Sequence, residues 1–147
     1  MRSALTALVL LTAACGGPGN SLSGSIGESF SLDFDHADIR RQDLQLIIEY
    51  IKDPNATKVC KVVVDTEHLP IDSGAVVKST YFTQYVTVSR VATVGGDFPD
   101  VKSGEIHFES YNFSSGGTVS GTFDVLFVNG RTLHGDFENK VQVVSTN

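Results

Sequence analysis

Hydrophobic and polar residues alternate most regularly near the end of the chain, over residues 116–146, on both sides of an Asn129-Gly130 pair. One face of the first arm carries only apolar residues and glycine, and the same holds for one face of the second arm. These positions are Val119, Gly121, Phe123, Val125 and Phe127, and then Leu133, Gly135, Phe137, Val141 and Val143. A period of two is typical of a strand with one buried face, so this stretch predicts a β-hairpin.

The length of the hairpin loop follows from which faces must meet. A two-residue loop at Asn129-Gly130 would place Phe123 opposite Asp136, matching the apolar face of one arm to the polar face of the other. A three-residue loop over residues 128–130, with Gly130 in the left-handed region as a G1 bulge, removes this mismatch. The pattern therefore predicts the longer loop.

In that register, two aromatic rings lie over two glycines. Phe123 faces Gly135, and Phe137 faces Gly121, so each ring covers the glycine of the opposite strand. Such pairs allow a sharply curved strand to stay packed. We therefore expect a long curved hairpin in which these four residues and Gly130 are structural.

The rest of the chain has the same short-period pattern. Further strands are predicted at 28–35, continuing past a bend at 37–42, and at 57–66, 75–82, 85–94 and 105–111, with longer connections at 67–74 and 95–104. Residues 43–52 fit either a helical stripe or a strand, and their isoleucines and tyrosine favour the strand. The fold class predicted is all-β, a single antiparallel meander of eight or nine strands forming a small barrel or a β-sandwich.

The N-terminus reads as an export signal. A positive start with Arg2 precedes an apolar run over residues 4–14 that is too short to span a bilayer, and Cys15 follows directly. The segment L-T-A-A-C-G-G resembles the lipobox of bacterial lipoprotein precursors, although Thr12 stands where leucine is usual. The predicted division is a signal peptide at 1–14, a lipidated Cys15 with a Gly/Ser-rich tether at 15–27, and a domain at 28–147.

The resemblance to a lipobox implies a location in the cell. Acylation of Cys15, for example with palmitate, would anchor the protein in the bacterial envelope, and Gly16 after the cysteine favours the outer membrane. The alternative is ordinary secretion to the periplasm or beyond, with cleavage after Ala14. The C-terminal phrase G-T-V-S-G-T-F-D-V-L-F-V-N-G-R-T-L-H-G-D-F also resembles uncharacterised β-rich, calycin-like lipoproteins of myxobacteria and their relatives. That likeness covers the leader and the last third, and it implies a fold and a location but no activity.

Charge and cysteine content bear on two properties, the binding of nucleic acid and the presence of disulfide bonds. The formal net charge is -6 and Lys or Arg residues form no run, which argues against nucleic acid as a partner. Cys60 is the one cysteine outside the leader, so no internal disulfide is expected. It shares the parity of Val62 and Val64, which predicts a buried thiol in preference to a reactive one.

Histidines and carboxylates suggest three weak sites. In the predicted hairpin His134 lies across from Asp124, with Asp136 two residues along, which makes a surface contact the first interpretation and a metal or acid–base site the second. In two other groups, ordinary surface residues are again a better interpretation than a metal or acid–base site. These groups are the row Glu105, His107 and Glu109, and the bend Asp33, Asp35, His36 and Asp38. None has metal-ligand spacing, and the sequence carries no recognisable catalytic motif. We expect no cofactor, no metal and no enzymatic activity.

Two functions remain. The favoured one is a structural or protein-interaction module of the envelope that docks another protein through the long connections at 67–74 and 95–104. The alternative is a barrel whose aromatic inner face binds a small apolar ligand such as a lipid. That inner face would comprise Phe30, Phe34, Phe108, Phe123, Phe127 and Phe137.

Overall fold

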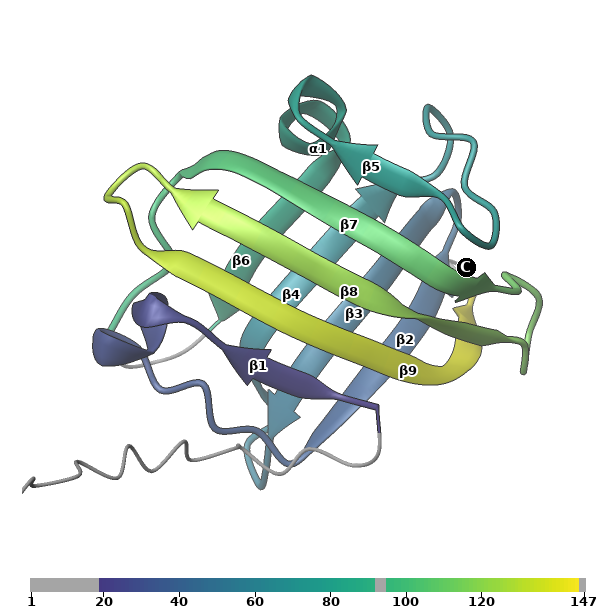
Figure 1. Ribbon diagram of the computed structural model, residues 1–147. Helices are drawn as coiled ribbons and strands as arrows, with labels where there is room; N and C mark the ends of the chain where they lie inside the picture. The colour runs from purple at the N-terminus through teal and green to yellow at the C-terminus, as the bar shows by residue number, and fades with distance from the viewer. Residues whose placement is uncertain (1–18, 92–94, 146–147) are drawn as a thin grey trace, which may run out of the picture.

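The computed structural model describes residues 19–91 and 95–145, which form one curled β-sheet with a short helix (Figure 1). The strands are β1 (Ser21–Ser23), β2 (His36–Gln42), β3 (Gln45–Lys52), β4 (Thr57–Asp65), β5 (Val76–Lys78), β6 (Val86–Val91), β7 (Val101–Tyr111), β8 (Thr118–Phe127) and β9 (Thr132–Val144). The helices are the 3-10 turn η1 (Ser25–Glu28) and α1 (Thr80–Tyr85). The predicted all-β class and strand number are confirmed.

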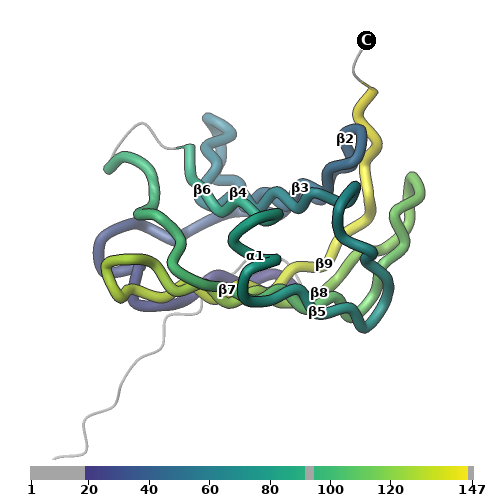
Figure 2. Tube along the Cα trace, turned by 90° about the horizontal axis from the view of Figure 1, so that it is seen from above, coloured from purple at the N-terminus to yellow at the C-terminus, as the bar shows by residue number. Residues whose placement is uncertain are grey.

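The sheet curls into a half-barrel. Its strand order is β5-β7-β8-β9-β2-β3-β4-β6, with β1 attached to β9 outside this path. Figure 2 shows the resulting two layers, with β9 rising from the lower layer toward β2 at one side. At the other side β6 and β7 are not neighbours, and α1 lies between the layers against β5, β6 and β7.

The prediction of a purely antiparallel meander is wrong. β2 and β9 pair in parallel, with Ile39 opposite Val141 and Gln42 opposite Val144. This contact joins the antiparallel set β5-β7-β8-β9 to the antiparallel set β2-β3-β4-β6. The sheet is therefore mixed.

The C-terminal hairpin has the predicted register. Phe123 pairs with Gly135 and Gly121 with Phe137. The loop is closed by a hydrogen bond of 3.0 Å from the Gly130 N–H to the Phe127 carbonyl, and Gly130 has a φ of 81°. The three-residue loop predicted from matching the apolar faces is confirmed.

Aromatic side chains meet across the interior between the two layers. The Tyr50 ring, on β3, is 5.0 Å from the Phe34 ring and 6.2 Å from the Phe123 ring on β8. Its hydroxyl donates a 2.6 Å hydrogen bond to the Asp136 carbonyl on β9, so this one side chain spans from one layer to the other. Burial raises the pKa of Tyr50, which keeps the phenol protonated as the donor. The predicted aromatic inner face is confirmed, with Phe30 only partly buried at its margin.

The segment before β2 differs from its prediction. Residues 28–35 do not form a strand, because the chain leaves η1 and crosses the end of the barrel without a strand partner. Phe34 is nevertheless buried. The alternation of residues 28–35 therefore predicted the burial of this side chain correctly, although the backbone there forms no strand pairing. The predicted tether is also too long: β1 pairs with β9, and Leu22 and Ile26 belong to the core. The folded body therefore begins before residue 28, and Cys15 lies outside the described residues.

Two other boundaries are corrected. The strand predicted at 75–82 is only β5, because Ser79 takes a positive φ of 58° and the chain turns into α1. Phe82 is fully buried there and anchors the helix against the sheet. The connection predicted at 95–104 ends earlier, since β7 already begins at Val101. Of the strand predicted at 85–94, residues 92–94 lie outside the described part.

The ambiguous segment 43–52 is a strand, β3, and it is covered on both faces. Glu49 points outward yet is 1% exposed, because long cationic side chains from the neighbouring strands fold over it. Arg40 on β2 forms a salt bridge with its carboxylate, and the Lys58 and Lys61 ammonium groups on β4 lie 3.5 and 3.9 Å away. Apolar and charged side chains are both buried along β3. This is why the sequence of this segment fitted the period of a helix as well as that of a strand.

Candidate functional site

The first predicted site is assembled on the outer face of β8 and β9. His134 Nδ1 is 2.8 Å from an Asp124 oxygen, and His134 Nε2 is 3.7 Å from an Asp136 oxygen. The two carboxylates approach opposite ring nitrogens, so they cannot converge with the imidazole on one ion. The arrangement orients the ring and gives the surface contact that the sequence favoured.

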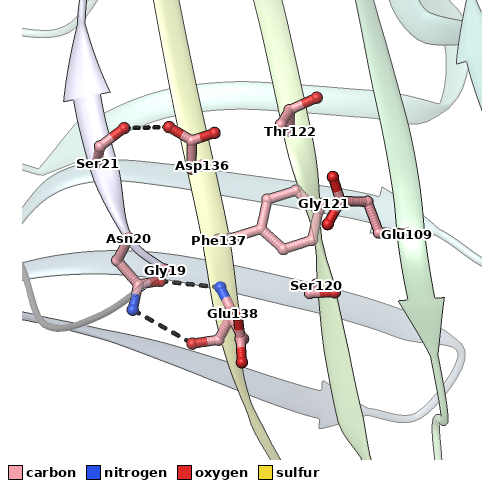
Figure 3. Close-up of a pocket in the computed structure, with 10 residues that line it drawn as sticks. All are labelled: Gly19, Asn20, Ser21, Glu109, Ser120, Gly121, Thr122, Asp136, Phe137 and Glu138. Atoms are coloured by element: carbon pink, nitrogen blue, oxygen red, sulfur yellow. Dashed lines mark hydrogen bonds between the residues drawn. The ribbon is translucent and has the colours of Figure 1, made fainter.

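A polar hollow of about 280 Å³ lies next to this contact (Figure 3). Gly121 and the ring of Phe137 lie at its base, and β1 lies along one side. Asn20 fixes that side by exchanging two hydrogen bonds with the Glu138 backbone, at 3.0 and 3.2 Å. The Ser21 hydroxyl bonds the Asp136 carboxylate, so this acid already has a partner within the protein.

The other two predicted groups stay apart or are neutralised. Glu105 and His107 face outward on β7, where they pair with Asp124 and Thr122 of β8, and Glu109 sits at a bulge in that ladder. The acidic bend before β2 is bound by one cation, since Lys52 Nζ lies 2.8 Å from Asp33 and 3.0 Å from Asp35.

That bend is a structural ion-pair cluster. The Asp53 backbone N–H and the Lys52 ammonium hold the pKa of Asp35 below its usual range, and the Asp33 and Asp35 carboxylates raise that of Lys52. His36 in turn approaches Asp53 at 3.3 Å. The carboxylates of Asp33, Asp35 and Asp53 are therefore already engaged in contacts within this bend.

The sequence missed a further cluster at the end of β4. Asp65, Glu67 and His68 each place one ligand atom within 4.8 Å of the others, so this set could hold a divalent ion through an imidazole nitrogen and two carboxylate oxygens. His68 Nδ1 is 2.8 Å from Asp65, and its ring stacks on Tyr85 at 5.2 Å. In the part of the chain that the structure describes, no second feature points to an ion at this cluster. The i, i+2, i+3 spacing was the available signal, but it is common in surface loops.

Titration of His68 tests this local geometry. The Asp65 carboxylate raises the pKa of His68 from 6.5, and His68 lowers that of Asp65. The protonated imidazole is thus favoured by the fold, and its contribution to stability is present at low pH and lost as pH rises through the folded pKa. We expect Asp65→Asn to move the NMR-measured pKa of His68 down, and Glu67→Gln to move it less. Equal shifts in both variants would contradict the assigned contact.

An apolar groove lies beside this cluster. Its volume is about 390 Å³, within the usual range for ligand pockets, and its lining comes from the 67–74 connection, β5 and α1. The lining residues are His68, Leu69, Pro70, Ala75, Val76, Val77, Lys78 and Tyr81. Val76 is 47% exposed and Tyr81 64% exposed, which is high for apolar and aromatic side chains. Tyr81 also stacks on Tyr85 at 6.4 Å.

The groove follows a free strand edge. β5 is the first strand in the sheet order, and within the described part of the chain it pairs with β7 alone, as Figure 1 shows at the top of the barrel. Along that ladder, the Phe108 N–H donates to the Ala75 carbonyl and the Ser79 N–H donates to the Gly104 carbonyl. Because antiparallel bonding alternates, the backbone groups of Val76 and Lys78 point away from β7. Among the described residues β5 has no strand on its other side, so these groups lie on the outer edge of the sheet, and the residues that carry them also line the groove.

The cysteines complete the set of predicted residues. Cys60 is fully buried, as predicted, and burial raises the pKa of its thiol far above the usual range. It is therefore a core residue without thiolate character at neutral pH. Cys15 lies outside the described residues.

Comparison with known proteins supplies no identity. No protein-family model, no curated protein and no solved structure matches this chain. The function is therefore argued from the geometry of the described residues.

Proposed function

We propose that this protein is a protein-interaction module of the bacterial cell envelope, and that it binds an extended segment of a partner protein in the groove beside β5. The observation that carries the proposal is the combination of an exposed apolar groove with an edge strand along it, β5, which among the described residues pairs with β7 on one side alone. Such edges accept an added strand, in which main-chain hydrogen bonds supply affinity and side-chain pockets supply specificity.

The groove also favours a particular partner chemistry. Val76 and Tyr81 offer an apolar surface for one side chain of the added strand. Lys78 stands at the end of β5, is exposed, and forms no salt bridge among the described residues. An extended segment with an apolar residue followed by a carboxylate, from a side chain or a chain end, would match both features.

The packing of the interior argues against the small-ligand alternative. A ligand between the layers would have to displace Tyr50, which is fully buried and bonded to the opposite layer. Small barrels are commonly filled by their own side chains in this way.

Replacing Tyr50 by Phe tests that interior. We expect the variant to lose about 1–3 kcal/mol in urea unfolding, because the Asp136 carbonyl is left without its buried donor. Tyr85→Phe, at a hydroxyl near the surface, should change stability by less than about 0.5 kcal/mol. A Tyr50→Phe variant as stable as the parent would reopen the interior as a binding site.

The proposed location in the cell envelope rests on the N-terminal segment that resembles a lipoprotein signal. Acylated Cys15 would hold the module in the envelope with residues 16–18 as a short spacer. In the described ranges, neither helix has the length and apolar character to cross a bilayer. Labelled palmitate should enter the protein in cells and fail to enter Cys15→Ser; equal labelling of the two would reject the anchor.

Site-specific photo-crosslinking in cells tests the interaction. A photoreactive residue at Tyr81 should yield one defined adduct, and the same residue at Val128, which is 60% exposed on the hairpin loop, should not. Val76→Pro should abolish the adduct, because it removes an N–H that faces the groove while leaving the bonds to β7. The proposal fails if the Val128 position yields the same adduct or if Val76→Pro leaves it unchanged.

A matched proline pair checks the backbone directions on which this rests. Val77 belongs to a bonded pair with Ile106, so Val77→Pro should cost about 3 kcal/mol in urea unfolding. Val76→Pro should cost much less. The reverse order would show that the free groups of β5 are those of Val77.

A further inference from the structure

Two carboxylates in the polar hollow beside β1 are without a cation. Glu109 on β7 and Glu138 on β9 line this hollow from opposite sides of β8 (Figure 3). Neither carboxylate forms a salt bridge or hydrogen bond with any residue that the structure describes, since Glu138 bonds Asn20 through its backbone alone. The next basic residue on β9, Lys140, directs its ammonium to Thr118 Oγ1 at 2.8 Å. The described chain therefore leaves this negative charge unneutralised.

Glu109 reaches the hollow because β7 bulges there. The register of β7 with β8 shifts between Phe108 and Ser110, so Glu109 is the extra residue in the ladder. A bulge bends its strand and redirects a side chain, and bulges are frequent beside functional sites. Figure 3 shows the result: the Glu109 carboxylate extends from β7 toward Gly121 of β8. The backbone thus aims this acid into the hollow.

A buried hydroxyl between the two acids also lacks a partner. Ser120 lies on the outer face of β8, directly across from Glu138, and is only 8% exposed. Its Oγ forms no hydrogen bond within residues 19–91 and 95–145, and Ser120 lines the hollow. Polar side chains buried to this degree normally have a hydrogen-bond partner. The Ser120 hydroxyl is therefore available to a ligand in the hollow.

The kind of ligand follows from these three acceptors. A divalent ion needs several oxygens around one point, and in the described chain the carboxylates of the hollow do not approach closely enough to form such a group. A primary ammonium instead carries three N–H donors that point in different directions. We propose that the hollow binds a primary ammonium group, which donates to the carboxylates of Glu109 and Glu138 and to Ser120 Oγ. The volume of about 280 Å³ suits a group of this size.

NMR titration of the full chain with n-butylammonium chloride tests the proposal. Tetramethylammonium chloride serves as a probe of equal charge that has no N–H donor. We expect the amide signals of Ser120 and Gly121 to shift saturably with butylammonium, with a Kd on the order of 1 mM, and not with tetramethylammonium. Glu109→Gln should weaken binding about tenfold, because it removes a charge-assisted hydrogen bond, and Ser120→Ala about threefold.

Glu105→Gln is the matched control. Glu105 is an exposed acid on the same strand and the same face, but it does not line the hollow. The Kd of this variant for butylammonium should stay within about twofold of the parent value. Nα-acetyl-lysine amide, titrated in parallel, identifies the source of the ammonium group. Tighter binding than butylammonium assigns the hollow to a lysine side chain of a partner protein, and equal or weaker binding assigns it to a free amine.

Three results would overturn the proposal. The first is an equal response to the two ammonium salts, and the second is equal weakening in Glu109→Gln and Glu105→Gln. The third is a saturable response to calcium chloride that butylammonium does not displace, which would make the hollow a metal site. Because the hollow and the β5 groove share no lining residue, Val76→Pro should keep the binding of butylammonium, and the two proposals fail independently.

Discussion

Gly135→Ala should lose about 2–3 kcal/mol in urea unfolding, because its new Cβ would lie 2.4 Å from two atoms of the Phe123 ring. That ring is fully buried and also contacts Tyr50, so it has little freedom to move away. Phe123→Leu removes the ring with which the new Cβ would clash. The double variant should recover about 1–2 kcal/mol relative to the sum of the single changes, which a double-mutant cycle measures directly.

Gly121→Ala is the contrasting case. Its Cβ would meet the His107 carbonyl oxygen at 2.0 Å as well as the Phe137 ring at 2.8 Å. A backbone atom of the neighbouring strand cannot be trimmed by substitution, so Phe137→Leu should give no recovery, and the loss should exceed that of Gly135→Ala. Additive losses at Gly135 together with rescue at Gly121 would show that the rings and glycines do not meet as described.

Glu49→Gln should lose about 3 kcal/mol, measured by urea unfolding at low salt. The carboxylate is the shared partner of Arg40, Lys58 and Lys61, and neutralising it leaves three cations around a buried amide. Repulsion among them is screened by salt, since each is about a quarter to a third exposed. The loss should therefore shrink in 1 M salt.

Glu105→Gln is the control for this effect. Glu105 is an exposed acid on the outer face of β7, and its neutralisation should change stability by less than about 0.5 kcal/mol at either salt concentration. If Glu49→Gln behaved like Glu105→Gln, the cationic cover over β3 would have no energetic role. The apparent burial of Glu49 would then be of no consequence for folding.

Tyr50 and its aromatic neighbours fill the interior between the two layers. Aromatic residues on an inner face suggested a hollow barrel, but here they contact each other and cross from layer to layer. The surface feature on which the proposed interaction rests is the groove beside β5.

Much of the architecture followed from local alternation. Matching apolar faces across the Asn129-Gly130 turn required an odd loop, and the same argument placed Phe123 over Gly135. The parity of Cys60 with Val62 predicted its burial. These predictions succeeded because strand side chains alternate strictly, so a register error would expose an entire face.

Alternation was misleading where side chains are buried without a strand partner. Phe34 reaches the core from an irregular segment, and Phe82 reaches it from α1. Periodicity reports which side chains leave water, and it is silent on where the backbone finds its hydrogen bonds. Their alternation therefore predicts strands where the backbone forms none.

The sequence by itself determined the strand content, the curved hairpin with its register, and the buried thiol, because each depends on neighbours along one strand or across one turn. Tertiary structure alone decided the parallel pairing of β2 with β9, the place of β5 at an edge of the described sheet, and the burial of Arg90 beside the rings of Phe30 and Phe98. The reason is physical: these three features depend on which segments, distant in the chain, become neighbours, and no local pattern of residues encodes that choice.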